Sequence, residues 1–315
     1  MFLSYGYVFE KIGESFSLTL YSGSTNQTKD IFKKQAELQI RIHALEKGMS
    51  IGHVRVGFGK EKAFSIIEDL EDLLKKGGAK PFVVESVSVL QKYIEFNGNM
   101  GADMVDVGTA LNRLCSLYNI KINDVGGIYN LNLKDISSKI QCSFDSFSQS
   151  RFSIRDFGDS PLEVEKVCAA LKLCERTPSA CNRQSWRVHV YTENNLVAKM
   201  FELQGGSKGF NKQMQCAILV CGDLRNYGFY EQNLPFVDGG LYAMNLLYSL
   251  HYYGLATIPL TMGHKWRVIK KIKQEMNIPG NEIPVLLIGV GTYKDDFKVA
   301  VSHRYSYKQY VKFNQ

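Results

Sequence analysis

The sequence has no long apolar run, no block of like charge and no paired cysteine motif. No stretch approaches the roughly 18 apolar residues that a membrane span needs. The first residues lack the basic segment and the long apolar core of a signal peptide. The seven cysteines are odd in number and form no C-x-x-C pair. These absences predict reduced thiols, a cytoplasmic location and no membrane partner.

Charge is modest and dispersed. Lysine and arginine exceed aspartate and glutamate by 38 to 31, which gives a net charge of +7. This excess permits small ligands that bear phosphate, but it does not indicate a nucleic-acid partner.

Several catalytic motifs are also absent. The sequence has no G-x-S-x-G, no H-E-x-x-H and no glycine-rich phosphate loop of the Walker type. The glycines of 289–291 lack a third glycine and a following helix, which excludes a Rossmann dinucleotide site. His43 and Glu46 lie close in sequence, but no third ligand is visible, so we expect no metal site.

The length of 315 residues suggests about two domains. From about Thr28 to Tyr118, apolar residues recur at intervals of three and four, which is typical of amphipathic helices. We therefore expect residues 1–140 to form a mainly helical domain or extension. From Ser143 onward, helical and strand-like segments alternate, and we assign 141–315 to a second domain.

The second half has clear element signals. Ser160–Glu163 matches a capping box with proline at the first helical position, which predicts a helix to about Arg176. Residues 186–191 alternate as a half-buried strand does. Two continuous apolar runs, 216–223 and 283–293, predict central strands buried on both faces. Between these runs, Asp238 is expected to open a long helix that ends at Gly254.

Two short polar segments could bind a ligand. Arg151 and Arg155 flank Ser153, and guanidinium groups match phosphate oxygens in a bidentate manner. The loop 177–186 offers hydroxyl and amide groups that could meet the polar edge of a heteroaromatic ring. Taken singly, each has a plainer interpretation, namely a solvated basic turn and a loop that uses its residues for backbone chemistry.

Together the two segments are more specific. The order R-x-S-x-R-x-F, about twenty residues with a helix, then P-S-A-x-N-x-Q-x-W resembles the nitroreductase family of FMN-dependent oxidoreductases. Gly209–Asn211, 254–259 and Arg304 follow in the expected order. The resemblance covers 143–315. It implies an α+β fold with a nitroreductase-like mixed central sheet flanked by helices, here joined to the mainly helical N-terminal domain.

The resemblance also implies a flavin site. The residues that it assigns to FMN are Arg151, Phe152, Ser153, Arg155, Pro178, Ser179, Ala180, Asn182, Asn211, Pro259, Leu260, Thr261, Met262 and Arg304. The arginines would hold the phosphate, and the 178–182 loop would reach the flavin from a partner subunit. Asn211 would meet the pyrimidine edge, and the backbone N–H of Thr261 would face flavin N5. No side chain is expected to be catalytic, because N5 carries the hydride.

Three positions depart from the family pattern. Ser302 stands where many relatives have a lysine, and Met214 replaces a frequent lysine or arginine. Thr261 replaces a common acidic residue, although its backbone role needs no particular side chain. The phosphate would therefore depend more on Arg151, Arg155 and Arg304.

Some residues are candidates for the substrate pocket. They are Tyr227, Phe229, Tyr230 and Phe236 in an aromatic segment, Asp238, and His43 in a glycine-rich loop region that could cover the flavin. Core packing explains the aromatic residues equally well. A helix end with satisfied polar groups explains the segment around His43.

The implied activity is that of an FMN-dependent oxidoreductase. NAD(P)H would reduce FMN, and the flavin would then reduce a nitroaromatic, quinone or enone-like acceptor by ping-pong hydride transfer. The family resemblance implies a homodimer with flavin at the interface and a C-terminal tail that crosses over; the alternation in 303–314 predicts an added edge strand. Two alternatives remain: a flavin-dependent dehydrogenase or oxidase acting on a biosynthetic intermediate, and a flavin-binding or partner-binding module without turnover.

Overall fold

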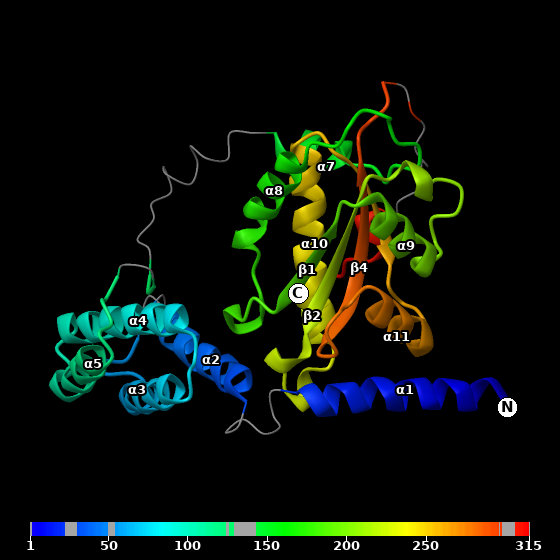
Figure 1. Cartoon of the computed structure of the whole chain (residues 1–315). Coiled ribbons are helices and arrows are strands. Elements are labelled where there is room, and N and C mark those ends of the chain that lie inside the picture. The colour runs from blue at the N-terminus through cyan, green and yellow to red at the C-terminus, as the bar shows by residue number, and fades with distance from the viewer. Residues whose placement is uncertain are drawn as a thin grey trace.

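The computed structural model describes residues 2–22, 30–49, 54–123, 126–128, 143–295, 297 and 306–314. Most of the first half consists of helices that stand beside a sheet built by the second half (Figure 1). The helices of the first half are α1 (Phe2–Tyr21), α2 (Ile31–Met49), α3 (Lys60–Lys75), α4 (Lys80–Asn99) and α5 (Val105–Leu117). No helix in these described ranges is both long enough and apolar enough to cross a membrane.

Helices α2 to α5 share one apolar core, as the periodicity of the first half predicts. Leu38, Ile42, Leu45 and Met49 follow each other at helical spacing along α2, and all four are buried in this core. Helix α1 lies elsewhere, against α11 (Trp266–Glu275) and the 3₁₀ helix η4 (Leu224–Asn226) of the second half (Figure 1). The N-terminal region is therefore helical, but its first helix packs on the sheet-containing part.

The sheet has four described strands in the order β1-β2-β4-β3. The strands are β1 (Trp186–Tyr191), β2 (Cys216–Asp223), β3 (Ala256–Thr261) and β4 (Glu282–Gly291). The predicted α+β class is confirmed. Each described pair is antiparallel, where we expected a mixed sheet. The long helix α10 does connect β2 to β3, which run in the same direction, but β4 lies between them and pairs with both.

The sheet is covered on both faces by helices (Figure 1). The covering helices are α8 (Val164–Leu173), α9 (Asn194–Gln204), α10 (Leu234–Tyr252) and α11 (Trp266–Glu275). On β2, Ile218 and Val220 pack with α8 and α10, whereas Ala217 and Leu219 pack with α9 and α11. Successive side chains of a strand point to opposite faces, so a strand between two helical layers must be apolar throughout. This confirms the prediction that 216–223 is a central strand.

Two predicted helix starts are wrong. Helix α8 begins at Val164 with Glu163 as its cap, and no side-chain capping bond forms, so the expected capping box is absent. The helix ends at Leu173 and continues to Arg176 as the 3₁₀ helix η1 (Cys174–Arg176). Helix α10 begins at Leu234 rather than Asp238, because Pro235 occupies its first turn, where a missing N–H costs nothing.

The predicted C-terminal edge strand is not formed by residues 306–314. They contain the 3₁₀ helix η6 (Tyr307–Gln309) and irregular backbone, and residues 303–305 lie outside the described ranges.

Candidate functional site

Residues 151–158, called here the arginine segment, run beside β3, which is an edge strand of the sheet. The backbone N–H of Ile154 donates to the Thr257 oxygen at 2.9 Å, and the Ile154 side chain is buried. The neighbouring arginines, Arg151 and Arg155, remain partly or fully exposed. Burial of the apolar residue between them therefore fixes the backbone while both cations face outward.

Neither arginine meets a carboxylate within the described part of the chain. Each guanidinium donates to the carbonyl oxygen of a residue one or two positions away, at 3.1 and 3.4 Å. The nearby carboxylate of Asp156 is paired with Lys294 at 2.5 Å, and this hydrogen bond lowers its pKa. Within the described residues, Arg151 and Arg155 therefore have no carboxylate partner, and two exposed guanidinium groups suit the forked binding of a phosphate.

His251 lies next to the arginine segment, although no motif in the sequence indicates this. Its Nε2 lies 2.7 Å from the Ser150 hydroxyl, and its Nδ1 lies 3.2 Å from the Tyr293 hydroxyl. Burial and the positive charge of Arg151 lower the pKa of His251. A residue near the end of α10 reaches the arginine segment only because the helix crosses the sheet, which a linear pattern does not reveal.

Gln204 and Gln213 connect the region around Asn211 to β3 and to the arginine segment. The Gln204 amide donates to the Thr261 oxygen at 3.1 Å, which ties the end of α9 to the end of β3. Gln213, in the 3₁₀ helix η3 (Asn211–Gln213), accepts the N–H of Phe157 at 3.2 Å. The structure thus gathers the arginine segment, Asn211 and β3 in one part of the molecule.

The residues of 259–262 have different exposures. Pro259 lies in the middle of β3, where a missing backbone N–H is tolerated because the strand is at the edge. Thr261 is exposed, whereas Leu260 and Met262 are buried in the core. Met214, which occupies the position of a frequent cation, is 4% exposed and belongs to the same core.

The loop 178–184 is held by a buried carboxylate. Asp238 is 2% exposed and accepts the backbone N–H of Ala180 at 3.0 Å. Its second oxygen accepts hydroxyl hydrogens of Ser185 at 3.2 Å and Tyr227 at 2.8 Å. Asp238 and the fully buried Tyr227 therefore position the loop, and neither is a surface on which a substrate could rest.

The backbone of this loop is strained. Cys181, Asn182 and Gln184 have φ values of 51°, 53° and 46°, in the left-handed region. Such conformations cost on the order of 1–3 kcal/mol each and persist where surrounding contacts enforce them. Arg183 supplies such contacts: it is buried and meets Glu231 through two hydrogen bonds of 2.8 and 2.9 Å. Burial opposes the charge of Arg183, but the bonds to Glu231 raise its pKa.

The two groups lie at opposite edges of the sheet. The arginine segment accompanies β3, and the loop 178–184 leads directly into β1. They are also near opposite ends of β2. Gln213 contacts the arginine segment just before the strand begins, and the N–H of Asp223 at its end donates to Ser185. Eight residues of strand span about 24 Å. One chain therefore does not bring the two groups to one small ligand.

The remaining predicted site residues are scattered. Phe229 is 39% exposed and Tyr230 is fully exposed. His43 lies in α2, where its Nδ1 meets the Glu46 carboxylate at 3.0 Å. Arg304 lies outside the described residues.

Among the described residues, His189, Cys221 and Glu282 have potential metal-ligand atoms within 4.8 Å of one another. The hydrogen bond of 2.6 Å between His189 and Glu282 already accounts for their closeness. Burial raises the pKa of the Cys221 thiol, which opposes the thiolate that a metal would need.

Comparison with known proteins finds similarity in the second half of the chain. Residues 149–207 match the model of the nitroreductase family. A protein of Archaeoglobus fulgidus that carries the name "Putative NADH dehydrogenase/NAD(P)H nitroreductase" is 25% identical over 149 residues, which are 46% of this chain and 83% of that relative. The expected resemblance to the nitroreductase family is confirmed. The nitroreductase match includes both the arginine segment and the loop 178–182.

Solved structures of nitroreductases align with about half of the chain. An FMN-dependent nitroreductase from Clostridium difficile aligns at 22% identity with a TM-score of 0.46, covering 54% of this chain and 98% of that one. A nitroreductase family protein from Streptococcus pneumoniae aligns at 21% identity with a TM-score of 0.47, covering 55% and 100%.

Proposed function

We propose that this chain is an FMN-dependent oxidoreductase that uses NAD(P)H to reduce an organic acceptor of the nitroaromatic, quinone or enone type by ping-pong hydride transfer. The observation that carries the proposal is the pair of arginines, Arg151 and Arg155, held outward without carboxylate partners in the described chain. The family match over 149–207 includes this pair.

FMN would supply the redox chemistry when bound, by accepting and donating a hydride at N5. The chain would supply position and charge. Arg151, Arg155 and Arg304 would hold the phosphate, with Ser153 as a further donor. Asn211 would hydrogen-bond the pyrimidine edge, and the N–H of Thr261 would point toward N5. In this proposal the chain contributes no acid, base or nucleophile to the reaction.

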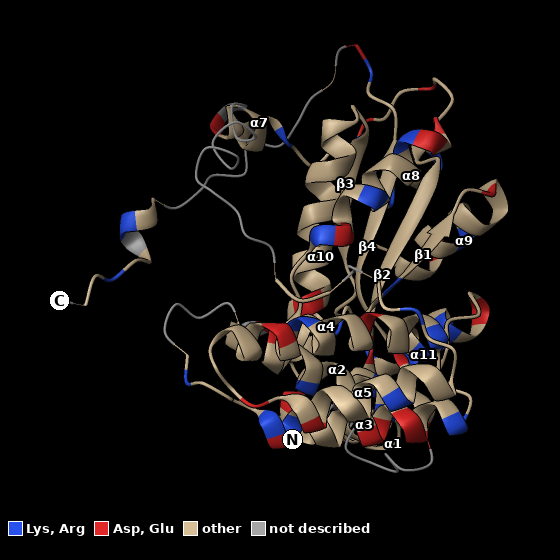
Figure 2. Cartoon of the chain, turned by 90° about the vertical axis from the view of Figure 1, so that its left-hand side faces the viewer, with Lys and Arg blue, Asp and Glu red and all other residues tan. Residues whose placement is uncertain are grey.

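We further propose a homodimer with one flavin at each of two equivalent interface sites. Because the arginine segment and the loop 178–182 are far apart in one chain, a second copy would supply the loop to each site. The C-terminal residues support this arrangement. They extend away from the sheet in Figure 2, and Tyr310 and Phe313 are 70% and 79% exposed. Exposed aromatic residues of this kind are common where another chain binds.

The proposal extends to domain organisation and location. We place the division between a helical N-terminal unit and the flavin unit near residue 140, with α1 serving the flavin unit. The described cysteines are all free thiols, which is typical of the reducing cytoplasm.

The test is reconstitution of the purified protein with FMN under anaerobic conditions. We expect the protein to retain the flavin through gel filtration as a dimer. NADH or NADPH should then bleach the flavin absorbance, and a nitroaromatic or quinone should restore it. A protein that binds no FMN would contradict the proposal. Bound flavin that NAD(P)H does not bleach would contradict the reductase direction and favour dehydrogenation of a biosynthetic intermediate.

A further inference from the structure

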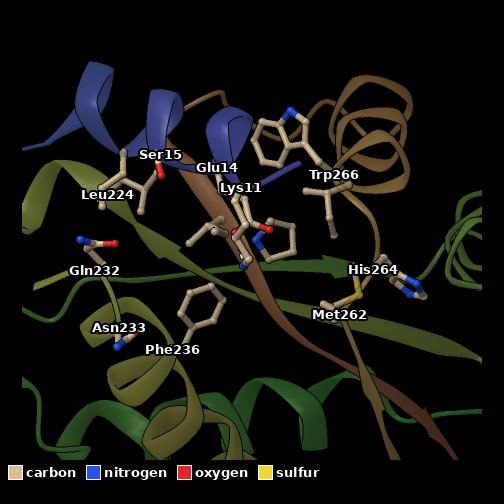
Figure 3. A pocket seen from close by; sticks show the side chains of 15 residues that line it. Lys11, Glu14, Ser15, Leu224, Gln232, Asn233, Phe236, Met262, His264 and Trp266 are labelled. Carbon is tan, nitrogen blue, oxygen red and sulfur yellow. Dashed lines mark hydrogen bonds and ion pairs between the residues drawn. The ribbon is translucent and has the colours of Figure 1, made fainter. Parts of the chain in front are cut away.

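A cavity of about 350 Å³ lies between α1 and the end of the sheet (Figure 3). This volume is within the usual range of small-ligand sites. Met262 and Gly263 form part of its wall, and they directly follow Thr261. The cavity therefore begins where β3 ends, at the place proposed above for the reactive ring of the flavin. The inference rests on that proposed function.

Helix α1 is closely fitted over this cavity. Gly13 packs against Trp266, so closely that a Cβ at position 13 would lie 2.9 Å from the indole ring. Farther along the helix, the Tyr21 hydroxyl lies where a Cβ of Gly280 would be only 2.5 Å away. At the end of α1, the buried Ser22 hydroxyl donates to the backbone carbonyl oxygen of Tyr227 at 3.0 Å. These close approaches fix α1 as a wall of the cavity.

The cavity combines a flat apolar surface with polar groups at its edge. Phe236 projects into it from α10, on the side opposite α1 in Figure 3. The side chain of Asn233 lies beside Phe236, and that of Gln232 lies nearer to Leu224 in the same wall (Figure 3). On α1, Ser15 contributes a small polar side chain. An aromatic face beside amide donors suits a planar ring that bears oxygen atoms.

We propose that α1 forms the outer wall of the electron acceptor's pocket. The acceptor of the proposed function would lie between α1 and Phe236. Its ring would pack against Phe236, its oxygen atoms would accept hydrogen bonds from Gln232 and Asn233, and Ser15 would limit its size. The N-terminal helix would thus determine which acceptors enter.

The experiment measures binding of 4-nitrobenzamide by isothermal titration calorimetry. It uses the full-length protein as purified and after saturation with FMN. Ser15→Phe fills the cavity, and Ile12→Phe is its control, because Ile12 lies on the same helix, is 57% exposed and is outside the cavity wall. Phe236→Ala removes the aromatic face, and Phe144→Ala is its control, because Phe144 is 61% exposed and is not in the wall.

We expect Ser15→Phe and Phe236→Ala each to weaken binding about tenfold, which corresponds to about 1.4 kcal/mol. The two controls should change it less than about twofold, and the FMN content should be equal in all variants. Wild-type protein that does not bind the probe, or binding that Ser15→Phe leaves unchanged, would overturn the inference. If no variant binds FMN, the proposed function fails, but titration of the protein as purified still decides whether the cavity binds the probe.

Discussion

The two halves of the candidate flavin site differ in how their polar groups are satisfied. In the loop 178–184, several polar groups have internal partners. Arg183 has Glu231, the N–H of Ala180 has Asp238, and the N–H of Gln184 has the Ser179 hydroxyl at 2.9 Å. In the arginine segment, residues 143–295 and the other described ranges give the two cations no partner but nearby carbonyl oxygens. Internal partners are typical of a loop whose polar groups maintain its conformation. Exposed cations that contact nearby carbonyl oxygens are typical of a segment that binds a ligand.

The largest expected effect comes from Glu231→Gln, which tests whether the loop is held by internal partners. This change leaves the Arg183 cation, whose side chain is 1% exposed, buried without a counter-ion. We expect a loss of about 3 kcal/mol in the free energy of unfolding, measured by urea denaturation. The control is Glu163→Gln, which breaks an exposed pair with Lys166 at 2.7 Å and should cost less than about 1 kcal/mol. Equal losses in the two variants would contradict this account of the loop.

Arg151→Ala tests the arginine segment. In contrast to Glu231→Gln, we expect it to change FMN binding and not the free energy of unfolding. Loss of a charge-assisted hydrogen bond to the phosphate should cost about 2 kcal/mol, which weakens FMN binding about thirtyfold. The free energy of unfolding without FMN should scarcely change, because Arg151 has no internal carboxylate partner in the described chain. Fluorescence titration of FMN measures the affinity. Lys270→Ala, on the exposed face of α11, should bind FMN as the wild type does.

A heterodimer decides whether the two halves meet across an interface. One chain carries Arg151→Ala and the other carries Ala180→Trp, and two different affinity tags isolate the mixed dimer. If each site combines the arginine segment of one chain with the loop of the other, one site has both lesions and the other has none. The mixed dimer should then bind about half as much FMN as the wild type, more than either parent variant. If it binds no more than its parents, each site lies within one chain.

The sequence predicted more of the arginine segment than of the loop's supports. The motif singled out Arg151 and Arg155, and both are at least partly exposed, while their role toward a ligand stays a prediction. The network around Arg183 involves partners 48 residues away, such as Glu231, and the fold alone brings them together. Tyr227 was a substrate-pocket candidate because of its aromatic segment, and Asp238 was a further candidate, yet both are buried and support the loop.

The same reasoning applies to the fold. The apolar runs of β2 and β4 revealed central strands, because a strand covered on both faces must be apolar throughout. The expectation of a mixed sheet was wrong because β4 lies between β2 and β3 and pairs with both. No local sequence pattern indicates this strand order. The role of α1 was also not predicted. Gly13 and Gly280 appear unremarkable in the sequence, and only their contacts with Trp266 and Tyr21 show why a larger residue would not fit.

A substitution of His251 has the smallest expected effect. It tests whether the pH dependence of stability involves the histidine next to the arginine segment. Burial and Arg151 lower its pKa in the folded chain, whereas the unfolded chain keeps an ordinary value of about 6.5. Below that pH the unfolded state binds protons more readily, so this histidine should reduce stability as the solution becomes more acidic. His251→Gln should therefore lessen the fall in melting temperature of the FMN-free protein between about pH 6.5 and pH 5.

Binding of the phosphate anion should oppose this effect. The anion would partly neutralise the field of Arg151 and so raise the pKa of His251, which lies in the same cluster with Ser150 and Tyr293. FMN-loaded wild type should consequently lose less stability in acid than the FMN-free protein, and His251→Gln should shrink that difference. If FMN raises the stability of the wild type and of the variant equally across this pH range, the protonation of His251 is not coupled to phosphate binding. The arginine segment would then bind its ligand farther from the end of α10 than we propose.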